Sequence, residues 1–114
     1  MHEYSLVSSL LERVTAEAAE RNATSVRKIR LLVGEHSGVE LDLLSWAFGV
    51  LRKNTTCAEA ELVVIAVAAR WECPRCSCEV PAGGTLMCPH CETPAKLAAG
   101  GELLLERIEL QVPD

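Results

Sequence analysis

Aromatic residues are scarce in this chain of 114 residues, which contains two Trp, one Tyr and one Phe. So few aromatic side chains offer little with which to line an aromatic substrate pocket, and no pairing of a nucleophile with a base stands out along the chain. The phosphate-binding pattern G-x-x-x-x-G-K-[ST] is also absent. These absences argue against an enzyme and against nucleotide hydrolysis.

An excess of positive charge is missing as well. The formal net charge is -5, whereas a protein that binds a phosphate backbone needs a basic surface. The cysteine-rich segment 71–100 itself holds two basic residues against three acidic ones. We therefore expect no nucleic acid partner.

The sequence contains no hydrophobic run of the length that crosses a membrane. Its first apolar stretch is amphipathic and is interrupted by Glu12 and Arg13, unlike the hydrophobic region of a signal peptide. We expect no membrane association. The six cysteines then indicate a cytoplasmic protein with reduced thiols rather than a secreted disulfide framework.

The most informative residues present are four cysteines in two Cys-Pro-x-Cys turns, Cys73 with Cys76 and Cys88 with Cys91. Each turn directs two sulfurs toward one point, and the eleven residues between the turns let the pairs meet. Four thiolates fill the tetrahedral shell of Zn(II), so the spacing predicts a structural zinc site. A thioredoxin-like redox pair would need one such motif at the start of a helix in a βαβ unit.

The hydrophobic pattern predicts an α+β fold. The expected elements are helices over 3–21 and 41–51 and strands over 25–33, 61–69 and 103–112. The strand over 61–69 is strongly apolar, which predicts that both of its faces are covered. We expect a small sheet with two helices on one face and an inserted four-cysteine zinc-ribbon lobe.

The same pattern predicts two lobes. Residues 1–70 plus 101–114 are expected to form an α/β lobe, and residues 71–100 a zinc-binding lobe. Glycines at 83–84 and 100–101 predict flexible points within and after the zinc lobe.

The first residues, Met1-His2-Glu3, suggest a second metal site. A free α-amino group has a pKa of about 8, so it competes for divalent metals near neutral pH. The amine, the adjacent amide nitrogens and the His2 imidazole can present in-plane nitrogen ligands, which suit Ni(II) or Cu(II) better than zinc. Taken alone, His2 would be read as an ordinary surface or cap residue.

Three features together resemble the HypA family of nickel metallochaperones of [NiFe]-hydrogenase maturation. They are Met1-His2-Glu3 leading into an amphipathic helix, the Gly-Glu-His-Ser-Gly-Val-Glu loop at 34–40, and the late pair of Cys-Pro-x-Cys turns. The resemblance covers essentially the whole chain. It implies a transferred Ni(II) in the α/β lobe and a structural Zn(II), with these residues as ligands: Met1, His2 and Glu3 for nickel, and Cys73, Cys76, Cys88 and Cys91 for zinc.

The resemblance also implies partners. Family members receive nickel, work with a hydrogenase-maturation GTPase and deliver the metal to the hydrogenase large subunit, and some also serve urease. We expect a monomer or a weak homodimer. The alternative function is a zinc-ribbon protein–protein adaptor without a nickel site, because both interpretations predict zinc and only the metallochaperone predicts nickel at His2.

Four further residues have roles that the sequence leaves open. Cys78 could replace a sulfur of the first turn, although Cys-x-Cys is a poorer chelating turn, and Cys57 is expected to be a small apolar filler. His90 is either a hydrogen-bond donor to a thiolate or an exposed residue. His36 is either an exposed loop residue or an auxiliary nickel contact.

Overall fold

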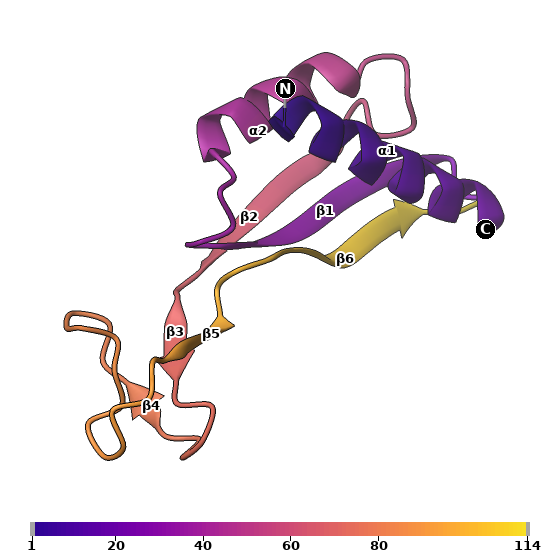
Figure 1. The fold of residues 1–114 in the computed structure, drawn as a ribbon. Helices are drawn as coiled ribbons and strands as arrows, with labels where there is room; N and C mark the ends of the chain where they lie inside the picture. The colour runs from indigo at the N-terminus through magenta and orange to yellow at the C-terminus, as the bar shows by residue number, and fades with distance from the viewer. Residues whose placement is uncertain (1, 114) are drawn as a thin grey trace. The chain divides into compact units, whose positions relative to one another are not determined.

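A computed structural model describes residues 2–113 of the chain. Within them the chain forms two helices, α1 (His2–Glu20) and α2 (Leu41–Leu51), and six strands, β1 (Ser25–Gly34), β2 (Glu61–Val67), β3 (Arg70–Glu72), β4 (Glu79–Val80), β5 (Lys96–Ala99) and β6 (Leu103–Gln111). The strands form two three-stranded sheets, in the orders β2-β1-β6 and β4-β3-β5 (Figure 1). The expected α+β fold is confirmed: both helices lie on one face of the first sheet, and the cysteine-bearing segment is inserted before β6.

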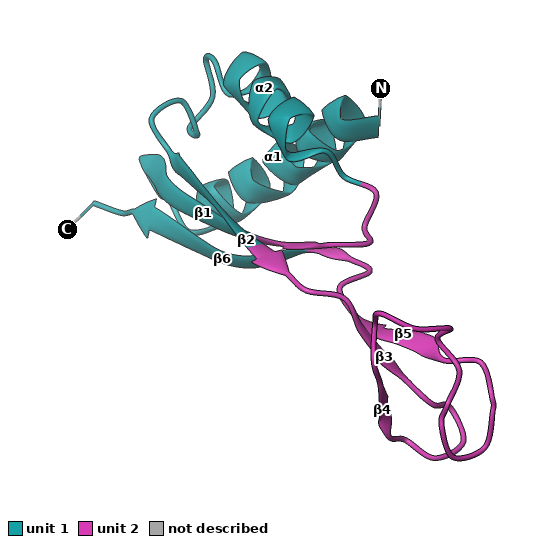
Figure 2. Ribbon diagram, turned by 90° about the vertical axis from the view of Figure 1, so that its left-hand side faces the viewer, with its two compact units in different colours: residues 1–31, 39–65, 104–114 teal, residues 32–38, 66–103 magenta. Residues whose placement is uncertain are grey.

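The chain divides into two compact units (Figure 2). Unit 1 comprises residues 1–31, 39–65 and 104–114, and unit 2 comprises residues 32–38 and 66–103. Unit 1 contains both helices and most of the first sheet. Unit 2 contains the second sheet and every cysteine except Cys57.

The core of unit 1 lies between its helices and the central strand β1. On α1 the buried positions are spaced by three or four residues, which places them on one face of the helix. Burial of each such aliphatic side chain contributes about 1.5–3 kcal/mol. The buried apolar residues of this core are Val7, Leu11, Val14 and Ala18 from α1, Val26, Ile29 and Leu31 from β1, Leu44, Ala47 and Phe48 from α2, and Cys57 and Ala60 from the loop before β2.

The strand predicted over 61–69 differs from the expectation. β2 ends at Val67, and none of its seven residues is buried. It is an edge strand that pairs with β1, and the helices lie on one face of this sheet only (Figure 1). The predicted burial on both faces is therefore wrong, because an apolar run does not reveal whether a strand is central or at an edge.

Two glycines meet backbone to backbone in unit 2. A Cβ atom at Gly34 would lie 2.2 Å from the carbonyl oxygen of Gly100, and Gly100 itself has a φ of 86°. The N–H of His36 donates to the same carbonyl oxygen at 2.8 Å, and the N–H of Gly34 donates to the carbonyl of Glu102 at 2.8 Å. Only glycine allows this approach, since any side chain would separate the two segments.

Replacing Gly34 by Ala is expected to lower the free energy of unfolding by about 2–3 kcal/mol, because the added Cβ overlaps backbone atoms that cannot move aside freely. Urea unfolding followed by circular dichroism measures the effect. The matched control is Gly49→Ala in α2, where no heavy atom lies within 4 Å of the added Cβ. The control should leave stability unchanged or raise it by up to about 1 kcal/mol. Equal stability of both variants would contradict the packing argument.

Candidate metal centres

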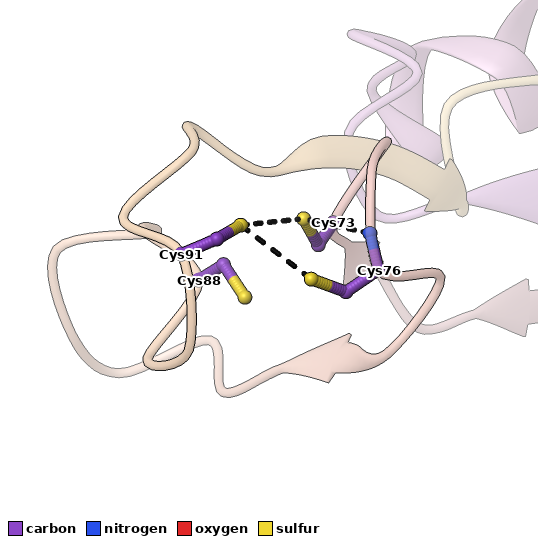
Figure 3. A group of neighbouring side chains, drawn as sticks. All are labelled: Cys73, Cys76, Cys88 and Cys91. Atoms are coloured by element: carbon purple, nitrogen blue, oxygen red, sulfur yellow. Dashed lines mark hydrogen bonds between the residues drawn. The ribbon is translucent and has the colours of Figure 1, made fainter.

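Four cysteine sulfurs converge in unit 2 (Figure 3). The sulfurs of Cys73, Cys76, Cys88 and Cys91 all lie within 4.8 Å of one another. Cys91 Sγ is 3.5 Å from Cys73 Sγ and 3.5 Å from Cys76 Sγ. Tetrahedral zinc with Zn–S bonds of about 2.3 Å requires sulfurs about 3.8 Å apart. The donor type, number and spacing of this four-sulfur cluster therefore fit a structural zinc ion.

Backbone hydrogen bonds shape the first Cys-Pro-x-Cys turn. The N–H of Cys73, just after β3, donates to the carbonyl of Cys78, and the N–H of Ser77 donates to the carbonyl of Cys73, both at 2.9 Å. Ser77 lies in the left-handed region with φ 58°. The N–H groups of Arg75 and Cys76 point at Cys73 Sγ at 3.4 and 3.3 Å. The first turn therefore directs two backbone donors at one sulfur of the cluster.

The second turn repeats this geometry. The N–H of Cys88 donates to the carbonyl of Thr93 at 2.9 Å, and the N–H of Glu92, with φ 59°, donates to the carbonyl of Cys88 at 2.8 Å. The backbone N–H of His90 points at Cys88 Sγ at 3.4 Å, while the His90 side chain is exposed. His90 therefore faces the sulfur through its main chain, and both turns present backbone donors to the cluster.

The thiols of the four-sulfur cluster differ in pKa. Hydrogen bonds from the side chain and the backbone of Thr93 lower the pKa of Cys91 to about 6. Hydrogen bonds to Cys91 and Cys73 raise the pKa of Cys76 to about 12. Cys91 is therefore the first thiolate of the set, and a metal that binds all four sulfurs must displace the proton of Cys76.

Two of the predicted nickel ligands, His2 and Glu3, lie on the first turn of α1. His2 is exposed, whereas Glu3 is only 7% exposed. Glu3 Oε2 accepts the backbone N–H of Glu40 at 3.2 Å. This hydrogen bond, then the N–H of Glu3 itself, lower the pKa of the Glu3 carboxyl, and the charges of His2 and the amino terminus add to the effect. Met1, the third predicted ligand, lies outside the described residues.

Sequence reasoning missed the role of Glu40. This residue precedes α2 at its N-cap and makes no side-chain capping bond. Its own backbone N–H donates to the carboxylate of Glu3. The start of α1 is thereby tied to the start of α2. The only local signal was an acidic residue directly before a helix, which predicts a cap and not a partner 37 positions away.

The structure also shows the surroundings of Cys57 and His36, two residues whose roles the sequence left open. Cys57 is fully buried in unit 1, as expected of a small apolar filler, and burial raises the pKa of its thiol. His36 is exposed and its ring meets the ring of Trp71 edge-on, with 5.7 Å between the ring centroids.

Neither helix among residues 2–113 has the length and hydrophobicity that a membrane-crossing segment needs.

Residues 1–110 match the family model described as hydrogenase/urease nickel incorporation, metallochaperone, hypA. The chain belongs to the HypA family. HypA proteins are metallochaperones for nickel incorporation and not enzymes, so the family resemblance inferred from the sequence is confirmed.

Individual HypA proteins are similar over nearly their full length. The hydrogenase maturation factor HypA of Wolinella succinogenes is 38% identical, with 100% of this chain and 98% of the relative covered. That of Aquifex aeolicus is 34% identical, with 98% and 99% covered. The solution structure of the Ni metallochaperone HypA from Helicobacter pylori has a TM-score of 0.76 at 26% identity and covers 97% of this chain and 98% of that one. A second HypA solution structure has a TM-score of 0.82 at 26% identity, covering 99% and 98%.

Proposed function

We propose that this protein binds Ni(II) at its N-terminus through His2, Glu3 and Met1 and helps to insert it into [NiFe]-hydrogenase during maturation. The observation that carries the proposal is the first turn of α1, where the exposed His2 is followed in the chain by Glu3, whose carboxylate accepts the N–H of Glu40. The match of residues 1–110 to a family of nickel-incorporation metallochaperones supports the delivery of nickel to a hydrogenase.

The ligand chemistry follows from these groups. The imidazole of His2, the amine of Met1 and an intervening amide nitrogen are the nitrogen donors, a set that suits planar Ni(II). Glu3 keeps a negative charge next to them, since its pKa is lowered. The His2 side chain is exposed on the first helical turn, so bound nickel can pass to another protein without unfolding of the core.

We propose a structural role for the second metal. Zn(II) held by Cys73, Cys76, Cys88 and Cys91 has no open coordination position, so it stabilises unit 2 and does not react.

The partners that we propose are a hydrogenase-maturation GTPase, which supplies the nucleotide hydrolysis absent from this chain, and the hydrogenase large subunit as recipient. We place this work in the cytoplasm, where the six free thiols stay reduced.

The proposed role of the α-amino group of Met1 as a nickel ligand is tested by blocking that group. A flexible Gly/Ser extension of about ten residues before Met1 converts the amine into an amide, so nickel affinity should fall by at least about tenfold. The same extension after Asp114 is the control and should change nothing. Isothermal titration calorimetry of zinc-loaded protein gives the affinities. Equal nickel affinity in both proteins would refute the role of the amine, and no nickel binding by either would favour the zinc-ribbon adaptor.

A further inference from the structure

Cys78 places a fifth sulfur beside the four-sulfur cluster. Its Sγ lies 3.6 Å from Cys88 Sγ, nearly the separation of 3.5 Å found between Cys73 and Cys91 within the cluster. Cys78 is half-buried and packs against the small core formed by Cys73, Val80 and Cys88. The four-sulfur cluster does not include it. Unit 2 therefore holds one more thiol than a zinc ion needs.

The backbone holds this extra thiol in place. The carbonyl of Cys78 accepts the N–H of Cys73 at 2.9 Å, and the carbonyl of Thr93 accepts the N–H of Cys88 in the same way. Cys78 and Thr93 thus occupy equivalent positions in the two turns. Thr93 Oγ1 lies 3.1 Å from Cys91 Sγ, so both positions face a cluster sulfur. The second turn carries a hydroxyl there, whereas the first carries a thiol, which is a preferred zinc ligand.

We propose that Cys78 is a reserve zinc ligand that takes over the coordination position of Cys88. This inference rests on the proposed zinc site. In the exchange the Zn–S bond to Cys88 breaks and a Zn–S bond to Cys78 forms. The thiol proton of Cys78 passes to the sulfur of Cys88 across the 3.6 Å contact. Four thiolates coordinate before and after, so the charge of the site does not change.

Two physical arguments favour the exchange. Cys78 is already held close to Cys88, so its coordination orders little additional chain and costs little chain entropy. The entering and leaving groups are both thiols, so the number of Zn–S bonds is conserved. After exchange the second turn is attached through Cys91 alone, which would let that turn move while the metal stays bound.

The competing role for Cys78 is that of a hydrogen-bond donor to the Cys88 thiolate, as Thr93 is placed to be for Cys91. The two roles differ when Cys88 is lost. A donor then has no partner and the zinc site keeps three sulfurs, whereas a reserve ligand restores the fourth.

The test is the zinc affinity of serine variants, measured by competition with a chromophoric chelator. Cys88→Ser should bind zinc within about tenfold of the wild type, because Cys78 replaces the missing sulfur. Cys78→Ser/Cys88→Ser, and Cys76→Ser as the matched single variant, should bind at least about a thousandfold more weakly. Cys78→Thr, which copies the second turn, should match the wild type. Sulfur-to-cobalt charge-transfer bands of the Co(II)-loaded proteins should indicate four thiolates in Cys88→Ser and three in the double variant.

The outcomes separate the inference from the proposed zinc site. An equal loss of affinity in Cys88→Ser and Cys76→Ser would overturn the reserve ligand while leaving the zinc site intact. Absence of zinc from the wild type would overturn both. A measurement on the zinc-loaded wild type needs no folded variant: iodoacetamide followed by peptide mass spectrometry should label Cys88 as well as Cys78, and labelling confined to Cys78 would overturn the exchange.

Discussion

Replacing His2 by Ala is expected to lower nickel affinity by about a hundredfold or more while the zinc content stays unchanged, a loss of about 2.7 kcal/mol in binding free energy. The imidazole is the only proposed nitrogen ligand that comes from a side chain, and Ala cannot replace it. His2 is exposed, so the substitution removes no packing from the core. Calorimetry and absorption spectroscopy of zinc-loaded protein follow the binding, and a planar nitrogen-type nickel spectrum should disappear in the variant.

The matched controls are the two other histidines. His90→Ala removes an exposed imidazole beside the four-sulfur cluster, and His36→Ala removes one that contacts Trp71. Both should bind nickel as the wild type does. Undiminished nickel binding by His2→Ala would contradict the proposed site and move it elsewhere, with His36 the next residue to measure.

Removal of zinc is expected to unfold unit 2 while unit 1 keeps its helices. The hydrophobic core around the cysteines of unit 2 is very small: its buried members are Cys73, Val80 and Cys88. Such a core cannot offset the entropy of ordering the 38 residues of segment 66–103, so the metal must hold the segment together. Unit 1 instead has an apolar core shared by both helices and β1.

The measurement is hydrogen exchange of the protein before and after treatment with a strong chelator. Amides of β3, β4 and β5 should lose protection, and those of α1 and α2 should retain it. Cys73→Ser should give the same pattern, with zinc affinity reduced by more than about a hundredfold. Cys57→Ala is the contrasting variant: it should retain zinc, because Cys57 lies in unit 1, and lose only stability. Retained protection in zinc-free unit 2 would contradict the structural role.

The spacing of the cysteines predicted the four-sulfur cluster because ligand geometry within each turn is local. Two residues separate the cysteines of each pair, and this short loop fixes where the sulfurs point. Helix α2 begins and ends where the periodicity of apolar residues placed it, at Leu41 and Leu51, since burial of one helix face depends on neighbours three and four positions away.

The glycines and β2 show where local patterns were insufficient. Gly100 was expected to be a flexible point, yet it is buried and packs against Gly34 with a positive φ. Composition cannot distinguish a glycine that loosens the chain from one that permits close approach. The apolar run of β2 likewise indicated a strand but not its place at the edge of the sheet.

The sequence by itself determined the family, the four-cysteine cluster and the order of the two helices with β1, β2 and β6, because each depends on residue type and short-range spacing. It did not predict the short strands β3, β4 and β5 of unit 2. Only the tertiary structure decided that Glu3 is buried against the N–H of Glu40 and that Cys78 lies next to Cys88. These contacts join residues that are distant in sequence. They exist because packing of the helices and pairing of the strands bring the residues together, and no local pattern encodes that.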